Sequence, residues 1–367
     1  MADTSVSYKC PNCGAPLTFI PGHEKVSCEY CGNEFEVNAV EEMFKTKREL
    51  AAKAEEAQAT KWKTEEAGEE WSAEETSTLH AFTCSSCGAE LVCDENTMAT
   101  ECVYCGNPTM IPKRFEGTLK PDLVIPFKKT KADAVAALKE FYKGHYLLPS
   151  NFTANNRVEA IQPMYVPFWL FDSAVEAQAE FKAEKIHRHE TASEVITETQ
   201  VFSCHRVGKM QFEKIPADGS KKMDDAYMES IEPFNYAELV PFQTGYLTGY
   251  LADKYDVSAD ECAARADNRV ENSAIEVLKN SVQGYHTCSI ENSAVIKEGG
   301  KVIYAMVPVW ILTTRYNEVP YTFMMNGQTG KVVGSLPYDS TKAFLYPAVC
   351  SLIFVPIIYF ILKMFLV

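Results

Sequence analysis

The phrase Tyr165-Val-Pro-Phe-Trp-Leu170 returns later in the chain as Met306-Val-Pro-Val-Trp-Ile311. Both copies combine β-branched, aromatic and aliphatic residues, which is the composition of a strand. Each copy leads into a segment in which polar and apolar residues alternate. We therefore predict two related β units that pack together, each with a tryptophan as its anchor. The prolines inside the phrases predict strand edges or bulges.

Helix and hairpin signals surround the two phrases. Residues 130–143 predict a helix that Thr130 caps. Residues 258–282 predict a second helix that opens with a capping box. Residues 321–334 predict a hairpin with a glycine-containing turn. Together these signals predict an α+β fold, with an antiparallel-sheet-rich domain at residues 117–340.

Eight of the 13 cysteines form two copies of one pattern, 74 positions apart. In each copy, two C-x2-C pairs are separated by 14 residues. Four thiolates so spaced form a closed tetrahedral site, the geometry of structural zinc. We predict two small four-cysteine zinc ribbons, at residues 1–38 and 80–116, that hold two structural zinc ions through Cys10, Cys13, Cys28, Cys31 and Cys84, Cys87, Cys102, Cys105. Disulfides, a single iron or an iron–sulfur cluster are the alternatives.

Three physical expectations follow from the ribbons. The glycine after each second cysteine suits a turn residue with positive φ. A unit of ~30 residues cannot build a sufficient core, so zinc supplies most of its folding energy. Because a closed site has no open position, neither zinc is expected to be catalytic.

The remaining cysteines show no metal-binding spacing. Cys93 stands where the first ribbon has Phe19, which predicts a buried apolar position. The others are predicted to be small buried hydrophobes: Cys204, Cys262, Cys288 and Cys350. A second kind of metal site, or acid–base catalysis, at His187, His189 and His205 is an alternative, although no third ligand of recognisable spacing completes it.

Residues 39–79 differ in composition from the ribbons on either side. They are rich in Ala, Glu and Lys and contain no proline, which favours helix. Their few large apolar residues, among them Trp62 and Trp71, are too sparse for a buried face. We interpret the segment as an acidic, partly helical and solvated linker, with a docking helix for a partner as the alternative.

The chain carries a net charge of −15, of which −10 lies in residues 1–115. Nucleic-acid affinity rests on Lys and Arg that neutralise phosphates, so this balance argues against nucleic-acid binding, which remains the alternative function. The first residues lack a basic and an apolar region, which predicts no secretory signal. Thirteen cysteines without such a signal indicate thiolate chemistry in a reducing compartment.

The last 24 residues, 344–367, contain one charge, Lys363. As a helix they would span ~36 Å, enough for a ~30 Å hydrocarbon core. We predict a single transmembrane helix at the C-terminus, with the bulk of the chain in the cytoplasm, where thiolates stay reduced. An apolar helix in a soluble core is the alternative.

Both ribbons, the phrase at 119–127, the two V-P-x-W phrases and the turn Asn326-Gly-Gln-Thr-Gly330 together resemble bacterial membrane proteins with TFIIB-type zinc ribbons. Some relatives are labelled as helicase-like, but this chain has no phosphate-binding loop. The resemblance implies a membrane-anchored protein that recruits PspA-like, SPFH-type or TPM-domain proteins during envelope stress. Because the chain also has none of the common catalytic motifs, we expect a non-enzymatic adaptor.

Overall fold

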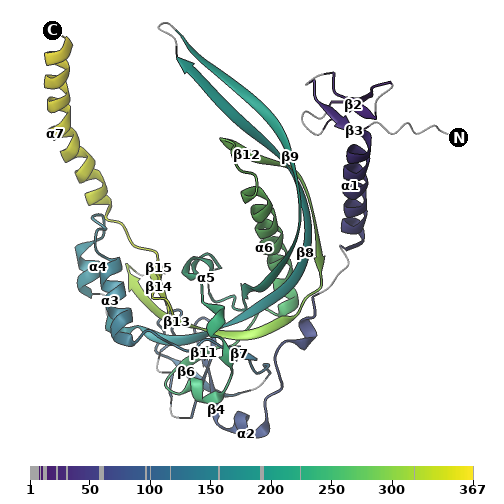
Figure 1. Ribbon diagram of the computed structural model, residues 1–367. Helices are drawn as coiled ribbons and strands as arrows, with labels where there is room; N and C mark the ends of the chain where they lie inside the picture. Colours follow the sequence, from purple (N-terminus) through teal and green to yellow (C-terminus); the bar gives the residue numbers. More distant parts are fainter. Residues whose placement is uncertain are drawn as a thin grey trace. The chain divides into compact units, whose positions relative to one another are not determined.

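The computed structural model divides the chain into two compact units, each assembled from separate stretches of sequence (Figure 1). Unit 1 consists of Met1–Ala67, Leu170–Ala217 and Ala259–Val302, and unit 2 of Gly68–Trp169, Asp218–Ser258 and Ile303–Val367. The structure describes residues 8, 10, 15–21, 24–29, 32–57, 62–95, 97–99, 101–115, 117–155, 158–190, 194–223, 225–317 and 319–366.

Unit 2 is organised around a mixed sheet. The strand order is β10-β7-β13-β8-β11-β5-β4-β6, and the β7–β13 and β8–β11 pairs are parallel. The fold is thus α+β, but with parallel pairs that the sequence did not predict. The strands are β4 (Leu79–Cys84), β5 (Glu90–Asp94), β6 (Met110–Arg114), β7 (Leu123–Val124), β8 (Gln162–Glu190), β10 (Val240–Pro241), β11 (Leu251–Asp253) and β13 (Val302–Tyr316).

The two V-P-x-W phrases occupy equivalent positions in β8 and β13. The Pro167 carbonyl accepts a hydrogen bond from the Gly219 N–H at 2.8 Å, and the Pro308 carbonyl accepts one from the Gly327 N–H at 2.8 Å. Gly327 is needed for this close approach, because a Cβ on it would lie 2.7 Å from the Phe127 ring, whereas a Cβ on Gly219 would make a tight contact of 3.1 Å with Trp169 Nε1.

The same equivalence extends to the tryptophans. Trp169 Nε1 donates to the Val257 carbonyl at 2.9 Å, and Trp310 Nε1 donates to the Lys129 carbonyl at 3.0 Å. In both cases the accepting residue lies two positions before the first residue of a helix, Ala259 for Val257 and Lys131 for Lys129. The two glycine carbonyls are also equivalent. The Gly219 carbonyl accepts hydrogen bonds from the N–H groups of residues 256 and 257, and the Gly327 carbonyl accepts them from the N–H groups of residues 128 and 129.

These contacts define two interlocked repeats, repeat A (residues 123–219) and repeat B (residues 251–327). The parallel strand of each repeat pairs with the phrase of the other: β11 lies opposite Met164 and Tyr165, and β7 opposite Ala305 and Met306. Met164 and Ala305 each lie three residues before the proline of their phrase, and Tyr165 and Met306 each lie two residues before it. The predicted pair of β units is therefore present, and the repeats exchange their short strands.

The prediction that the prolines mark edges or bulges is wrong. Both phrases lie in central strands, since β8 is flanked by β13 and β11, and β13 by β7 and β8. Proline is tolerated in these central strands because the partner strands β11 and β7 are short. The β11 ladder reaches only Met164 and Tyr165, so the missing N–H of Pro167 removes no bond from that ladder.

In unit 2, a helix packs on a β-hairpin. The predicted helix at 130–143 is α3 (Lys131–Phe141), and Thr130 caps it through a capping box with Asp133. The predicted hairpin is formed by β14 (Val319–Asn326) and β15 (Val332–Gly334). Leu138 of α3 joins Trp310 and Phe323 in a buried core. The connection after α3 contains α4 (Ser150–Asn155) and the 3-10 turn η2 (Val158–Ala160).

Unit 1 contains a second sheet-and-helix layer. Here β8 continues as the middle strand between β9 (Val195–Asp218) and β12 (Thr287–Glu298). The predicted second helix is α6 (Ala259–Asn280), drawn beside these strands in Figure 1. One face of α6 is buried, and so is one face of β8 in this region. The apolar residues that line this buried face of β8 are Val175, Ala177, Ala179, Phe181 and Ala183.

The predicted solvated linker is in fact anchored in both units. It contains α1 (Val37–Ala57), the 3-10 turn η1 (Thr64–Glu66) and α2 (Ala73–Ser77). In unit 1, Trp62 packs edge-on against Phe171 and donates its Nε1 to Asp267 at 3.1 Å. In unit 2, Trp71 packs edge-on against Phe115 and Phe242. Two large aromatic side chains are enough to anchor a segment that lacks a periodic apolar face.

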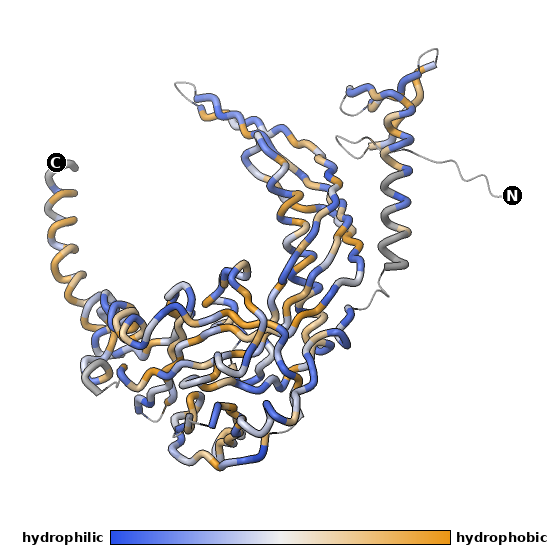
Figure 2. The backbone as a smooth tube through the Cα atoms, turned by 60° about the horizontal axis from the view of Figure 1, so that its bottom comes forward, coloured by the Kyte–Doolittle hydropathy of each residue, from blue (hydrophilic) through white to orange (hydrophobic). Residues whose placement is uncertain are grey.

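The chain's C-terminal helix is α7 (Ser340–Leu366), which contains Pro347 and Pro356. Its residues 340–363 are long and apolar enough to cross a membrane, and none of the most apolar stretch is buried. Figure 2 colours most of this helix as hydrophobic. Helix α7 is therefore a candidate transmembrane helix, and it begins four residues earlier than predicted.

The remaining elements are β1 (Thr18–Phe19), β2 (Lys25–Ser27), β3 (Glu34–Glu36), α5 (Asp225–Ile231), η3 (Tyr236–Glu238) and η4 (Thr244–Leu247).

Candidate metal centre

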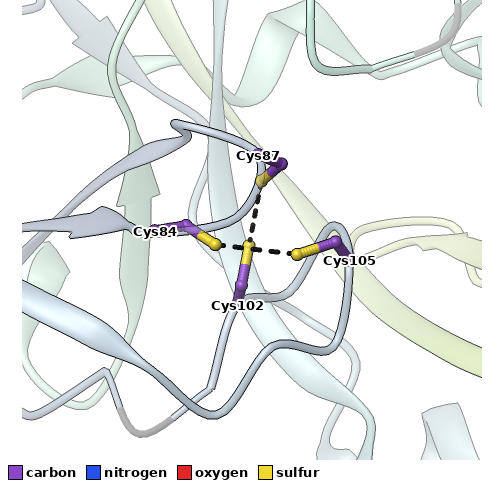
Figure 3. Close-up of side chains that lie close together, drawn as sticks. All are labelled: Cys84, Cys87, Cys102 and Cys105. Atoms are coloured by element: carbon purple, nitrogen blue, oxygen red, sulfur yellow. Dashed lines mark hydrogen bonds between the residues drawn. The ribbon is translucent and has the colours of Figure 1, made fainter.

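The four cysteines of the second ribbon meet in unit 2 (Figure 3). All four sulfur atoms lie within 4.8 Å of one another. The Sγ atoms of Cys84 and Cys105 are 3.6 Å apart, and those of Cys87 and Cys102 are also 3.6 Å apart. Among the residues that the structure describes, this is the group whose side chains come close enough to hold a metal ion.

These distances fit a tetrahedral ion. A tetrahedron with metal–sulfur bonds of ~2.3 Å has sulfur–sulfur edges of ~3.8 Å. Since protein sulfur supplies four ligands, a bound tetrahedral ion would have no position left for water or a substrate. The donor set therefore suits a structural metal and excludes a catalytic one at this site.

The local backbone forms the two turns that carry the ligands. The N–H of Cys84 donates to the Ala89 carbonyl at 2.9 Å, and that of Cys102 donates to the Asn107 carbonyl at 2.8 Å. Gly88 and Gly106 have φ values of +70° and +66°, as predicted for the residue after each second cysteine. Each turn thus closes around a sulfur pair without steric strain.

The thiols differ in how readily they ionise. Burial raises the pKa of Cys84, but the N–H groups of Cys87 and Ser86 and the neighbouring thiols more than offset this and lower it to about 7. Burial raises the pKa of Cys102. Ionising all four thiols together therefore requires a nearby cation, which a bound metal supplies.

The second ribbon is part of the large sheet, not a separate module as predicted. Its strand β5 pairs with β11 of repeat B. Side chains from distant sequence also bind the backbone of the ligand turns: Lys222 Nζ donates to the Cys87 carbonyl at 2.7 Å, and Thr313 Oγ1 donates to the Val103 carbonyl at 2.7 Å. Arg315 lies at the second turn, 3.4 Å from the Cys105 carbonyl.

The charges of these side chains suit the ligand set. Four thiolates around a divalent ion leave a net charge of about −2. Lys222 and Arg315 place two positive charges at the two turns. No sequence pattern could have indicated them, because they lie 135 and 210 positions from the carbonyls that they contact.

Replacing Lys222 by methionine is expected to weaken metal binding by about tenfold, the lower end of the effect of removing an outer partner of a metal ligand. The variant keeps the aliphatic stem but loses the charge and the bond to the Cys87 carbonyl. Competition with a chromophoric chelator measures the affinity. Lys221→Met is the matched control, because the neighbouring side chain is also exposed. Equal affinities of the two variants would contradict this role of Lys222.

A buried carboxyl lies near the second turn. Asp253 of β11 is only 2% exposed and accepts a hydrogen bond from Ser220 Oγ at 2.6 Å. The hydroxyl of Tyr104 is buried close to it without a well-formed hydrogen bond. Burial raises the pKa of Asp253 to about 7, even though the hydrogen bond from Ser220 favours the charged form.

This raised pKa predicts that unit 2 loses stability between pH 6 and pH 7. In the unfolded chain the carboxyl ionises near ~3.9, so at pH 6 the unfolded state has lost the proton that the folded state retains. Raising the pH therefore favours unfolding, by about 1 kcal/mol from pH 6 to pH 7 and by a few tenths more to pH 8. Denaturant unfolding of wild type and Asp253→Asn in detergent measures this difference. A pH-independent difference would show that Asp253 titrates normally.

The first ribbon is described only in part. Cys10 and Cys28 are both buried, whereas Cys13 and Cys31 lie outside the described residues. The backbone bonds of the second ribbon recur: the Cys10 N–H donates to the Ala15 carbonyl, and the Cys28 N–H to the Asn33 carbonyl. Gly32 has a φ of +70°. The described half of this ribbon thus has the same turn geometry.

The other predicted positions lie apart from this site. Cys93 is fully buried, as predicted, and donates its thiol to the Thr97 carbonyl at 2.9 Å. Cys204 and Cys262 are buried, Cys288 is half-buried, and Cys350 on α7 is exposed, so the prediction of a buried position is wrong for Cys350.

His187 and His189 are exposed on β8, and His205 is half-buried on β9. No metal-binding cluster forms around these histidines in the described part of the chain.

Comparison with known proteins gives one informative similarity. No family model and no solved structure matches the chain. The chain is 32% identical over 337 residues to the protein named "Uncharacterized protein YdjG" of Bacillus subtilis (strain 168), and the alignment covers 92% of each chain. The similarity thus extends over nearly the whole length of both proteins. The chain belongs to the same family as YdjG.

Proposed function

We propose that the protein is a non-enzymatic scaffold that is anchored in the membrane through α7 and recruits partner proteins from the cytoplasm. The observation that carries the proposal is the closed four-cysteine site in unit 2, the unit that also carries the exposed apolar helix. A closed site can hold a fold together but cannot activate water. An apolar helix without a buried face is best accommodated by lipid.

The metal in this proposal is zinc, one ion in each ribbon. Four thiolates in tetrahedral geometry favour zinc among the common cellular metals. For the first ribbon the proposal rests on its sequence pattern and on the turns at Cys10 and Cys28, which repeat those of the second.

The two ribbons have different roles in this scheme. The second is built into the large sheet and contributes stability. The first pairs only its own strands β1, β2 and β3 into a sheet and continues directly into α1 in an acidic stretch of the chain. We assign partner docking to the first ribbon and the acidic segment after it. By the resemblance to TFIIB-type zinc-ribbon proteins, the partners are PspA-like, SPFH-type or TPM-domain proteins of the envelope stress response.

Cross-linking in intact cells tests the docking role. The full-length chain and a Cys28→Ser variant are isolated from membranes, and the cross-linked proteins of the three classes are quantified. We expect the variant to remain in the membrane and to lose those partners. Cys288→Ser is the control, because Cys288 lies on β12 outside both ribbons. Unchanged partners in Cys28→Ser would refute docking through the first ribbon.

A further inference from the structure

The loop between α3 and α4 presents an unusual group of exposed apolar side chains beside the start of α7. Tyr146 is 78% exposed, Tyr338 is 74% exposed and Leu147 is 41% exposed. Outside α7, Tyr146 and Tyr338 are the two exposed tyrosines among the residues that the structure describes. Exposed aromatic side chains thus gather at one place in unit 2.

Hydrogen bonds fix this loop to the first turn of α7. The Asp339 N–H donates to the Leu147 carbonyl at 2.8 Å. Lys342 Nζ donates to the Leu148 carbonyl at 2.7 Å and lies 3.2 Å from Ser150 Oγ. Leu148 itself belongs to the buried core of unit 2. The exposed side chains are therefore held rigidly next to the beginning of the helix.

The length of α7 places this group at the level of a membrane surface. The 24 residues Ser340–Lys363 span ~36 Å as a helix, slightly more than a hydrocarbon core of ~30 Å. Ser340 must therefore lie in or close to the headgroup layer, and Tyr338 precedes it by two residues. Tyrosine favours this layer because its ring is apolar and its hydroxyl can remain in water.

The shape and charge of the loop suit phospholipid. A surface hollow of about 370 Å³ lies between residues 144–148 and residues 336–338. Residues 141–149 contain no acidic side chain; they contain His145 and Lys143, and the ammonium group of Lys143 pairs with Glu140 in the last turn of α3. Asp339, the acidic residue directly after residues 336–338, accepts hydrogen bonds through its carboxylate from the N–H groups of Thr341 and Lys342. Basic residues next to a span favour anionic headgroups.

We infer that the membrane-facing loop, residues 144–148 together with Tyr338, inserts into the headgroup layer of the bilayer that α7 spans. Unit 2 then contacts the membrane at a second place and is held at a defined orientation instead of swinging on α7. The inference rests on the proposed membrane anchoring, and it adds a phospholipid-binding surface outside the helix.

Fluorescence quenching in vesicles of neutral and anionic phospholipid tests the inference on the full-length protein. Three variants each receive one reporter tryptophan: Tyr146→Trp in the loop, Phe354→Trp within α7, and Met98→Trp, at a 73% exposed apolar side chain within the second ribbon. The unsubstituted protein gives the background of the native tryptophans. Nitroxide labels on the headgroup or deep on the acyl chain serve as quenchers.

We expect the headgroup label to quench Tyr146→Trp at least about twofold more than Met98→Trp, because interfacial aromatic rings lie at headgroup level. The deep label is expected to quench Phe354→Trp most. If Phe354→Trp is quenched and Tyr146→Trp behaves like Met98→Trp, the loop does not touch the membrane and only the inference fails. If neither is quenched, α7 does not span the bilayer, and both the anchoring and the inference fail.

Discussion

Replacing Cys102 by serine is expected to abolish metal binding at the second ribbon and to unfold unit 2 at temperatures where the wild type is folded. Cys102 is 1% exposed, and its sulfur lies 3.6 Å from that of Cys87. Structural zinc contributes roughly 10–16 kcal/mol of apparent folding free energy in small domains. That range is comparable to the total stability of most domains, about 5–15 kcal/mol.

The loss of stability is expected to extend beyond the second ribbon, because the ribbon's strands belong to the large sheet of unit 2. Strand β5 pairs with β11, and β11 pairs with the V-P-x-W phrase of repeat A. Without the metal, the turns that hold β4, β5 and β6 together open, and β11 loses its neighbour on that side. Thermal unfolding in detergent, with metal content measured on the same sample, tests this. Cys288→Ser is the control, and a Cys102→Ser variant with wild-type melting would contradict a structural metal.

Replacing Trp310 or Trp169 by alanine is expected to destabilise unit 2 by about 3–5 kcal/mol each, the usual cost of removing a buried large aromatic side chain. Trp310 is 4% exposed and Trp169 is 2% exposed. Each substitution also removes the donor to a main-chain carbonyl two residues before a helix, at Lys129 or Val257. Because the two sites are equivalent in the interlocked repeats, the two losses should be similar.

Phenylalanine at the same positions separates packing from hydrogen bonding. Trp310→Phe and Trp169→Phe keep most of the apolar contact and lose the indole N–H, for an expected cost of about 1–2 kcal/mol each. Denaturant unfolding of all four variants gives the comparison. A near-neutral effect of alanine at one site, beside a large effect at the other, would show that the repeats are not energetically equivalent.

Local sequence signals predicted much of this fold. The capped helix at Thr130, the hairpin after Tyr321 and the turns of the ribbons each depend on residues close together in the chain, so their patterns could be recognised. The repeated V-P-x-W phrase likewise indicated two related β units. All four cysteines that meet at the candidate metal centre followed from C-x2-C spacing alone.

The parts that sequence missed depend on distant residues. Strand β11 is three residues long, too short for a recognisable strand pattern, and yet it joins the ribbon to repeat A. The exchange of short strands between repeats leaves no local trace. Lys222 and Arg315 contact the ligand turns from distant positions in the chain. Trp62 and Trp71 anchor a segment whose composition indicated a solvated linker.

In the proposed function, zinc ribbons and a membrane helix belong to one protein that functions at the membrane. The most direct test is the zinc content of the full-length chain recovered from carbonate-washed membranes. We expect the chain to stay in the membrane pellet with about two zinc ions per chain, one for each closed four-thiolate site. Release of the chain into the carbonate wash, or a pelleted chain without zinc, would contradict the proposed function.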